Sequence, residues 1–266
     1  MKIVVCVKHV PDLQADRQFT AEGRVDRTGG DGTLNELDEN AVEAAVSLVE
    51  QHGGEVTVLT VGPADAQDAV RRGLQMGAEH AVHVLDDAIA GSDVFGTATV
   101  LAAAVRRLGQ DTPVDLVVTG MAALDGLMSV LPTLLAAHLD RPQLTLAAEV
   151  TVEGDLVRVR RELDHVSKVL EATMPALVSV TDQANEPRYP SFKGIMAARK
   201  KTVLTWSLAD LGVDPSDVGP AGARTRVLDA VPRPPRENRV LITDEGDAGL
   251  RLAAYLAENN LVQGVS

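Results

Sequence analysis

The first 140 residues alternate short apolar runs with amphipathic segments, and this alternation constrains the fold more than any other feature of the chain. Four runs rich in Val, Leu and Ile are flanked by turn-forming residues: 2–7, 55–61, 81–85 and 115–120. Continuous apolar runs of this length are typical of strands that are covered on both faces. Helical periodicity predicts the intervening helices at 38–51, 65–76 and 93–108. The sequence therefore predicts an α/β fold with a mostly parallel, Rossmann-like nucleotide-binding sheet.

The pattern changes after Pro142. Residues 144–152 and 156–162 flank Gly154-Asp155, a two-residue hairpin turn, and predict antiparallel strands added to the sheet; 176–181 adds a Val-rich strand. Beyond Trp206 the periodicity fades into a proline-rich stretch, and an amphipathic segment follows at 247–259. We predict an α/β domain at 1–206 and an extended C-terminal arm with a short helix at 207–266. Such an arm is expected to embrace a partner, because alone it does not offset the entropy of ordering.

Composition excludes several classes of partner. The 45% hydrophobic content is ample for a buried core, but the net charge of −13 repels phosphate backbones and anionic lipids. We therefore expect neither nucleic-acid binding nor membrane insertion. The single cysteine, Cys6, excludes an intrachain disulfide and a Cys-based metal cage, and favours a reducing cytoplasm. The opening apolar run ends at Lys8, too early for a signal peptide.

Motifs that would indicate an enzyme are absent from the sequence. It contains no G-x-x-x-x-G-K-[ST], G-x-G-x-x-G, H-E-x-x-H or G-x-S-x-G pattern, and its six histidines are scattered. A stand-alone nucleotide-dependent enzyme would need a phosphate-activating lysine or a set of metal carboxylates. We therefore predict no catalytic residues and no metal site.

Two polar segments stand at predicted strand-to-helix junctions. Asn35 and Asp38 enter the first long helix, where they can cap it or can face a ribose or phosphate at the sheet edge. Residues 120–126 follow the most apolar strand and lead to a helix that contains Val130 and Leu131. Glycines allow close backbone approach and helix amides attract anions, so this segment is either an anion site or an ordinary βα turn.

A third segment, residues 185–201, holds two prolines around Phe192 and ends in a basic cluster. An exposed aromatic side chain on a rigid loop can serve as an interface anchor. The alternative is a loop whose phenylalanine folds back into the core.

Taken in order along the chain, these residues resemble the electron-transfer flavoprotein beta family over nearly the entire length. The resemblance lies in the V-K-x-V-P-D-like start at 5–12, the N-x-x-D-x-x-A-x-E pattern at 35–43, Val61-Gly62-Pro63, residues 71–78, Arg161-Glu162 and residues 187–201. It implies a heterodimer in which an alpha subunit holds most of the FAD and this subunit holds a structural AMP. It further implies electron transfer from acyl-CoA-type dehydrogenases of fatty acid β-oxidation, through a quinone-reducing oxidoreductase, toward the quinone pool.

The resemblance also implies site residues. By position, the AMP contacts of the family fall on Cys6, Asn35, Glu36, Leu37, Asp38, Val61, Gly120, Met121, Ala122, Ala123, Leu124, Asp125, Gly126, Ser129, Val130 and Leu131. Beyond Asp125 the family commonly carries Thr and Gln, whereas this chain has Ser129, Val130 and Leu131, which leaves backbone amides and Ser129 to hold the phosphate.

Two further sets follow from the same resemblance. Arg161 and Glu162 match a pair close to the alpha subunit and its flavin. The dehydrogenase-recognition residues fall on Tyr189, Phe192, Lys193, Ile195 and Met196. Phe192 stands where the family usually has a leucine, which implies a larger pocket on the dehydrogenase. The alternatives are a bifurcating-type subunit that binds a second FAD and a stand-alone nucleotide-binding α/β protein.

Overall fold

The computed structural model describes residues 1–12, 18–27, 32–231, 233–235, 237 and 239–262. The chain divides into two compact units, Met1–Leu228 and Asp229–Ser266. Every site residue predicted from the sequence lies in the first unit, whereas part of the proline-rich stretch lies outside the described residues.

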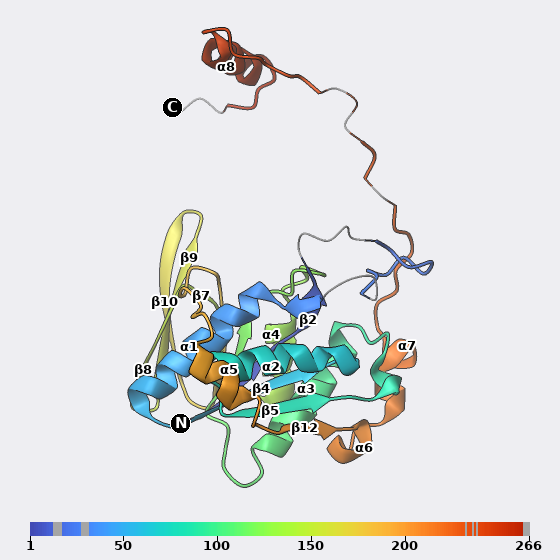
Figure 1. Ribbon diagram of the computed structural model, residues 1–266, viewed down its shortest axis with the longest axis vertical. Coiled ribbons are helices and arrows are strands. Elements are labelled where there is room, and N and C mark those ends of the chain that lie inside the picture. Colours follow the sequence, from blue (N-terminus) through green and yellow to red (C-terminus); the bar gives the residue numbers. More distant parts are fainter. Residues whose placement is uncertain (13–17, 28–31, 232, 236, 238, 263–266) are drawn as a thin grey trace. The chain divides into compact units, whose positions relative to one another are not determined.

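A parallel seven-stranded sheet forms the centre of the first unit (Figure 1). In spatial order its strands are β12 (Val203–Trp206), β5 (His80–Val84), β4 (Glu55–Val61), β1 (Lys2–Cys6), β6 (Leu116–Gly120), β11 (Ala176–Val180) and β7 (Gln143–Ala147). All neighbouring strands in it are parallel, which confirms the predicted α/β fold class. The four-residue β12 was not predicted, because a run so short carries little periodicity.

Helices cover both faces of this sheet, and the side chains of β1 show why. Ile3 and Val5 join the core beneath α1 (Glu36–His52) and α2 (Gln67–Met76), whereas Val4 and Cys6 join the core beneath α3 (Val94–Leu108) and α4 (Leu131–Leu139). Side chains of a strand alternate between its two faces, so a strand covered twice reads as a continuous apolar run. Short 3₁₀ turns at Ala64–Ala66 and Asp87–Ile89 follow β4 and β5.

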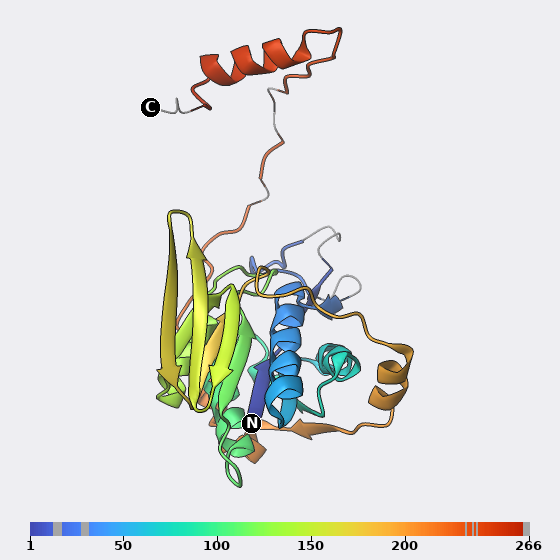
Figure 2. The ribbon, with the colours of Figure 1, turned by 90° about the vertical axis from the view of Figure 1, so that its left-hand side faces the viewer.

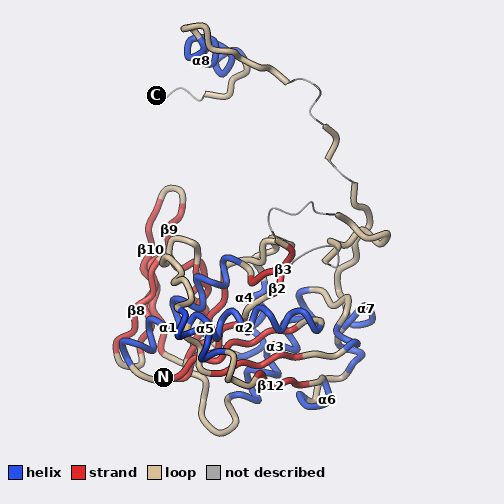
Figure 3. Tube along the Cα trace, in the orientation of Figure 1, coloured by secondary structure: helices blue, strands red, loops and turns tan. Residues whose placement is uncertain are grey.

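The antiparallel strands form a sheet of their own. Its strands are β8 (Glu149–Glu153), β9 (Leu156–Leu163) and β10 (Val166–Thr173), side by side in Figure 2 and red in Figure 3. The prediction of one strand over 144–152 was wrong, because Ala148 separates β7, which pairs with β11, from β8, which pairs with β9. A two-stranded sheet of β2 (His9–Pro11) and β3 (Gly32–Leu34) was not predicted either.

The chain after β12 keeps contact with the first core. Leu208 in α6 (Leu208–Leu211) and Val218, between the 3₁₀ turn Pro215–Asp217 and α7 (Gly219–Gly222), are both 1% exposed. In the second unit, α8 (Ala248–Glu258) is found within one residue of the predicted helix and has no buried residue. That 207–266 embraces a partner stays a prediction. Among the helices of the described residues we find none long and apolar enough to span a bilayer.

Candidate functional site

The topological switch point of the sheet lies at β1. The chain runs from β1 outward through β4 and β5, and later returns to the other side of β1 to form β6. In open α/β sheets, ligands bind where the carboxyl ends of two such strands diverge. Two segments begin there: residues 7 and 8 after β1, and the loop of residues 121–130 between β6 and α4. We refer to these segments, with the start of α1, as the switch-point edge.

Asp38 of α1 joins the two strands that diverge. Its carboxylate accepts hydrogen bonds from the backbone N–H of Lys8 (2.8 Å) and of Gly120 (3.2 Å). Burial raises the pKa of Asp38 to about 7, although the two amides act in the opposite direction. Gly120 has no room for a side chain, since a Cβ there would lie 2.5 Å from the Asp38 carboxylate and 2.8 Å from the Leu37 carbonyl.

Asn35 fixes the loop after β6. Its side-chain amide donates to the carbonyl of Ala122 (2.9 Å), and its side-chain oxygen accepts from the N–H of Leu124 (3.0 Å). Asn35 precedes the first residue of α1, but its side chain makes no cap to the helix. The interpretation that Asn35 and Asp38 only cap the helix is therefore wrong, because both side chains bind the strand ends and the loop. Asn35 is fully buried.

Asp125 forms ion pairs with two cations at the same edge. The Lys8 ammonium lies 2.8 Å and the Arg27 guanidinium 2.6 Å from its carboxylate, and only 1% of the Asp125 side chain is exposed. Burial opposes ionisation of this carboxyl, yet Lys8 and Arg27 hold its pKa below the ordinary value. Two cations thus surround one carboxylate here, close to the buried Asp38 carboxyl, which accepts from the N–H of Lys8.

The backbone of the loop 121–130 has an unusual conformation next to Asp125. Leu127 and Ser129 have φ angles of +49° and +55°, a region that residues other than glycine rarely adopt. Ser129 is followed by Val130 in the right-handed helical region. A left-handed residue next to a right-handed one turns successive N–H groups toward one side, an arrangement that binds anions. That this loop is an anion site rather than an ordinary βα turn stays a prediction. The observed helix α4 begins at Leu131, so Val130 lies just before the helix that was expected to contain it.

The structure brings most of the predicted nucleotide contacts to this edge. Glu36, Leu37 and Asp38 open α1, and the positions from Gly120 to Leu131 form the end of β6, the loop and the first residue of α4. Val61 ends β4, the neighbour of β1. Cys6 is buried at the end of β1, and burial, with a smaller effect of Asp38, raises the pKa of its thiol to about 12. Cys6 can therefore offer a ligand little beyond its backbone.

Two cations of this edge were missed by sequence reasoning. Lys8 carries a signal, because it directly follows the first strand at the position where a parallel sheet binds ligands. Arg27 carries none, since it lies in an irregular segment remote in sequence from Asp125.

The other predicted residues lie elsewhere. Arg161 and Glu162 belong to β9; the Arg161 guanidinium donates to the carbonyl oxygen of Thr145 in β7 (2.6 Å), and Glu162 accepts from Ser167 (3.1 Å). Residues 185–201, which we call the docking segment, include α5 (Phe192–Ala198). Its predicted recognition residues are Tyr189, Phe192, Lys193, Ile195 and Met196. Phe192 is 79% and Tyr189 91% exposed, so the alternative that Phe192 folds into the core is wrong.

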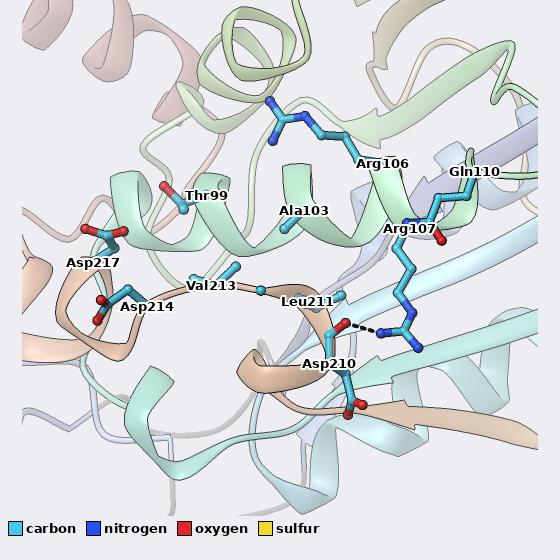
Figure 4. Close-up of a pocket in the computed structure, with 11 residues that line it drawn as sticks. Thr99, Ala103, Arg106, Arg107, Gln110, Asp210, Leu211, Val213, Asp214 and Asp217 are labelled. Carbon is cyan, nitrogen blue, oxygen red and sulfur yellow. Dashed lines mark hydrogen bonds between the residues drawn. The ribbon is translucent and has the colours of Figure 1, made fainter.

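A cavity of about 440 Å³ lies away from all these residues, between α3 and residues 210–217 (Figure 4). Arg107 of α3 points across it and donates to the carbonyl of Asp210, and its guanidinium also lies over the ring of Trp206 (4.7 Å). These contacts join α3 to the chain after β12. Among the described residues, no three His, Cys, Asp or Glu side chains lie together so that they could hold a metal.

Comparison with known proteins identifies the family. A family model described as "Electron transfer flavoprotein domain" matches residues 23–211. The chain is 43% identical to the electron transfer flavoprotein subunit beta of Mycobacterium leprae, over 98% of this chain and 99% of that protein. It is 32% identical to the subunit of the same name from Megasphaera elsdenii, over the full length of both.

A protein of another name is also similar. Protein FixA of Azorhizobium caulinodans is 36% identical over 84% of this chain and 80% of that protein. The family match covers well over half of the chain and agrees with the resemblance found in the sequence, so the prediction of an electron-transfer subunit rather than an enzyme is confirmed. The subunit name implies an alpha partner. The chain belongs to the electron transfer flavoprotein family, as a beta subunit.

Proposed function

We propose that this beta subunit holds one AMP at the switch-point edge and pairs with an alpha subunit that carries the FAD. The proposal rests chiefly on position: the Lys8 and Arg27 cations lie beside Asp125 at the ends of the strands, next to a loop with positive φ angles at Leu127 and Ser129. The 5′-phosphate would meet the amides around Ser129, and the ribose and base would lie along the ends of β1 and β4.

In this proposal AMP has a mechanical role. The phosphate pairs backbone N–H groups that would otherwise lack partners once the alpha subunit covers the edge, and each unpaired buried group costs about 1–3 kcal/mol. Ser129 supplies a hydroxyl, while Val130 and Leu131 supply only their backbone. The redox chemistry belongs to the flavin, and Arg161 and Glu162 of β9 would lie close to it.

The docking segment would receive acyl-CoA-type dehydrogenases, with Phe192 as the anchor between Tyr189 and Met196. These three side chains are 79%, 91% and 41% exposed, and aromatic side chains dominate many interfaces. Electrons would pass from the dehydrogenase flavin to the FAD and on to a quinone-reducing oxidoreductase, as part of fatty acid β-oxidation. The chain from 207 to 266 would embrace the alpha subunit, and the single buried thiol suits a reducing cytoplasm.

Nucleotide analysis of the purified heterodimer tests the proposal. Denaturation should release one AMP and one FAD per heterodimer, quantified by chromatography against standards. In Lys8→Gln and Arg27→Gln variants, AMP should fall well below one per heterodimer while FAD stays at one. A heterodimer that releases two FAD and no AMP would point instead to a bifurcating-type subunit, and one that releases FAD alone would show that the edge holds no nucleotide.

A further inference from the structure

The docking segment is fastened to α1 at its start. Asn185 and Asn40 exchange hydrogen bonds, since each side-chain amide donates to the backbone carbonyl of the other residue (2.9 and 3.0 Å). Asn40 is only 6% exposed, so this first attachment is buried on the α1 side.

Arg188 makes a second and more elaborate attachment. Its guanidinium donates to both carboxylate oxygens of Glu43 (2.7 and 2.9 Å) and to both of Glu50 (2.6 and 2.9 Å). Its backbone N–H also donates to Glu43 (3.0 Å), and the Ser47 hydroxyl donates to the same Glu43 carboxylate (2.8 Å). One planar side chain thus spans two turns of α1.

The far end of the docking segment is fastened to α2. Gly194 of α5 packs so closely that a Cβ there would lie 2.7 Å from the carbonyl oxygen of Gln75. Arg71 donates to the carbonyl of Lys201 (2.9 Å), and the Ser191 side chain caps α5 by accepting from the N–H of Gly194 (3.0 Å). The exposed Tyr189 and Phe192 therefore lie between an attachment to α1 and an attachment to α2.

The exposure of the Arg188 contacts indicates what they do. The Glu50 side chain is 58% and the Arg188 side chain 32% exposed, and an ion pair so open to solvent contributes little to folding. The Glu43 side chain is only 10% exposed, so the contact with Glu43 is the buried one of the two. A guanidinium that binds two carboxylates through two hydrogen bonds each does fix direction, which a lysine ammonium cannot. We call the four guanidinium hydrogen bonds of Arg188 to Glu43 and Glu50 the fork. Arg188 directly precedes Tyr189 and lies four residues before Phe192, so the fork fixes the start of the stretch that carries both aromatic side chains.

We propose that Arg188 is the positioning residue of the docking segment, which it holds on α1 through Glu43 and Glu50 so that Phe192 is presented in one orientation. This inference rests on the docking function proposed above. A preordered anchor binds more tightly because less side-chain and loop freedom is lost on association. The expected effect of losing the fork is therefore on encounter with the dehydrogenase and not on the chemistry of the flavin.

The test compares the wild-type heterodimer with Arg188→Lys, which keeps the charge and loses the fork. The KM for the heterodimer in dehydrogenase-coupled reduction should rise about fivefold, while kcat, FAD content and reduction by dithionite stay unchanged. Amide hydrogen exchange over residues 189–198 should become faster. Glu50→Gln, which weakens only one arm, should give a smaller rise. The matched control is Arg72→Lys, because Arg72 pairs with Glu39 (3.0 Å) and joins α1 to α2 outside the segment.

Phe192→Ala separates the two hypotheses. If Phe192→Ala raises KM and Arg188→Lys does not, docking stands and the positioning role is wrong. If Arg188→Lys raises KM with unchanged exchange, Arg188 contacts the dehydrogenase directly, which also overturns the positioning role. If Phe192→Ala leaves KM unchanged, the docking function itself fails and this inference fails with it.

Discussion

The switch-point edge and the docking segment both use charged and polar side chains, but they place them differently with respect to water. At the edge, the exposed fractions of the whole residues Asn35, Asp38 and Asp125 are 0%, 6% and 7%. In the docking segment, the Arg188 side chain is 32% and that of its partner Glu50 58% exposed, and Phe192 is 79% exposed. The other partner of Arg188, the Glu43 side chain of α1, is only 10% exposed. The polar groups of the edge are part of the core, whereas most of those in the segment lie on its surface.

This difference separates folding from recognition. A buried polar group that loses its partner costs the full penalty of its desolvation, because water cannot replace the lost contact. An exposed pair that loses a partner is rehydrated at little cost. Substitutions at the edge should therefore destabilise the chain, whereas substitutions of the exposed side chains of the segment should change binding and leave folding intact.

At a fixed pH, the largest expected effect on stability is that of Asn35→Ala. The change removes the two hydrogen bonds that Asn35 makes with the carbonyl of Ala122 and the N–H of Leu124. Their loss should lower the unfolding free energy by about 2 kcal/mol. Urea unfolding followed by circular dichroism measures the loss. A decrease in unfolding free energy of less than about 1 kcal/mol would show that water reaches the loop and replaces the lost contacts. The edge would then resemble the exposed segment.

Asp38 should give the next effect, as a dependence on pH. Its pKa is raised from 3.8 to about 7 in the folded chain, so between these values the folded state binds a proton that the unfolded state has released. The stability of the wild type relative to Asp38→Asn should therefore fall as pH rises from 4 to 7, by at most about 1.4 kcal/mol per pH unit, and level off above it. Urea unfolding of both proteins over that range tests this, and parallel curves would contradict the raised pKa.

The same contrast explains what could be predicted from the sequence. The parallel sheet followed from apolar runs, because a strand covered on both faces must be apolar throughout, as Val4 and Val5 illustrate. The break at Ala148 did not, since a change of pairing partner between β7 and β8 leaves no local signal in the sequence. The contacts of Asp125 with Lys8 and Arg27 join residues about a hundred positions apart, and no local pattern records them.

Phe192→Ala should have the smallest effect on folding and a large one on recognition. Because Phe192 is 79% exposed, its truncation should change the unfolding free energy by less than about 0.5 kcal/mol. Loss of an aromatic anchor costs about 2 kcal/mol of binding, which corresponds to roughly a thirtyfold rise in the KM of dehydrogenase-coupled reduction. Leu204→Ala is the matched control, since Leu204 is 50% exposed on β12, outside both regions. If both variants raise KM equally, Phe192 is no special anchor and the effect of its loss is not specific. A marked loss of stability in Phe192→Ala would show that Phe192, like Asn35 of the edge, serves folding.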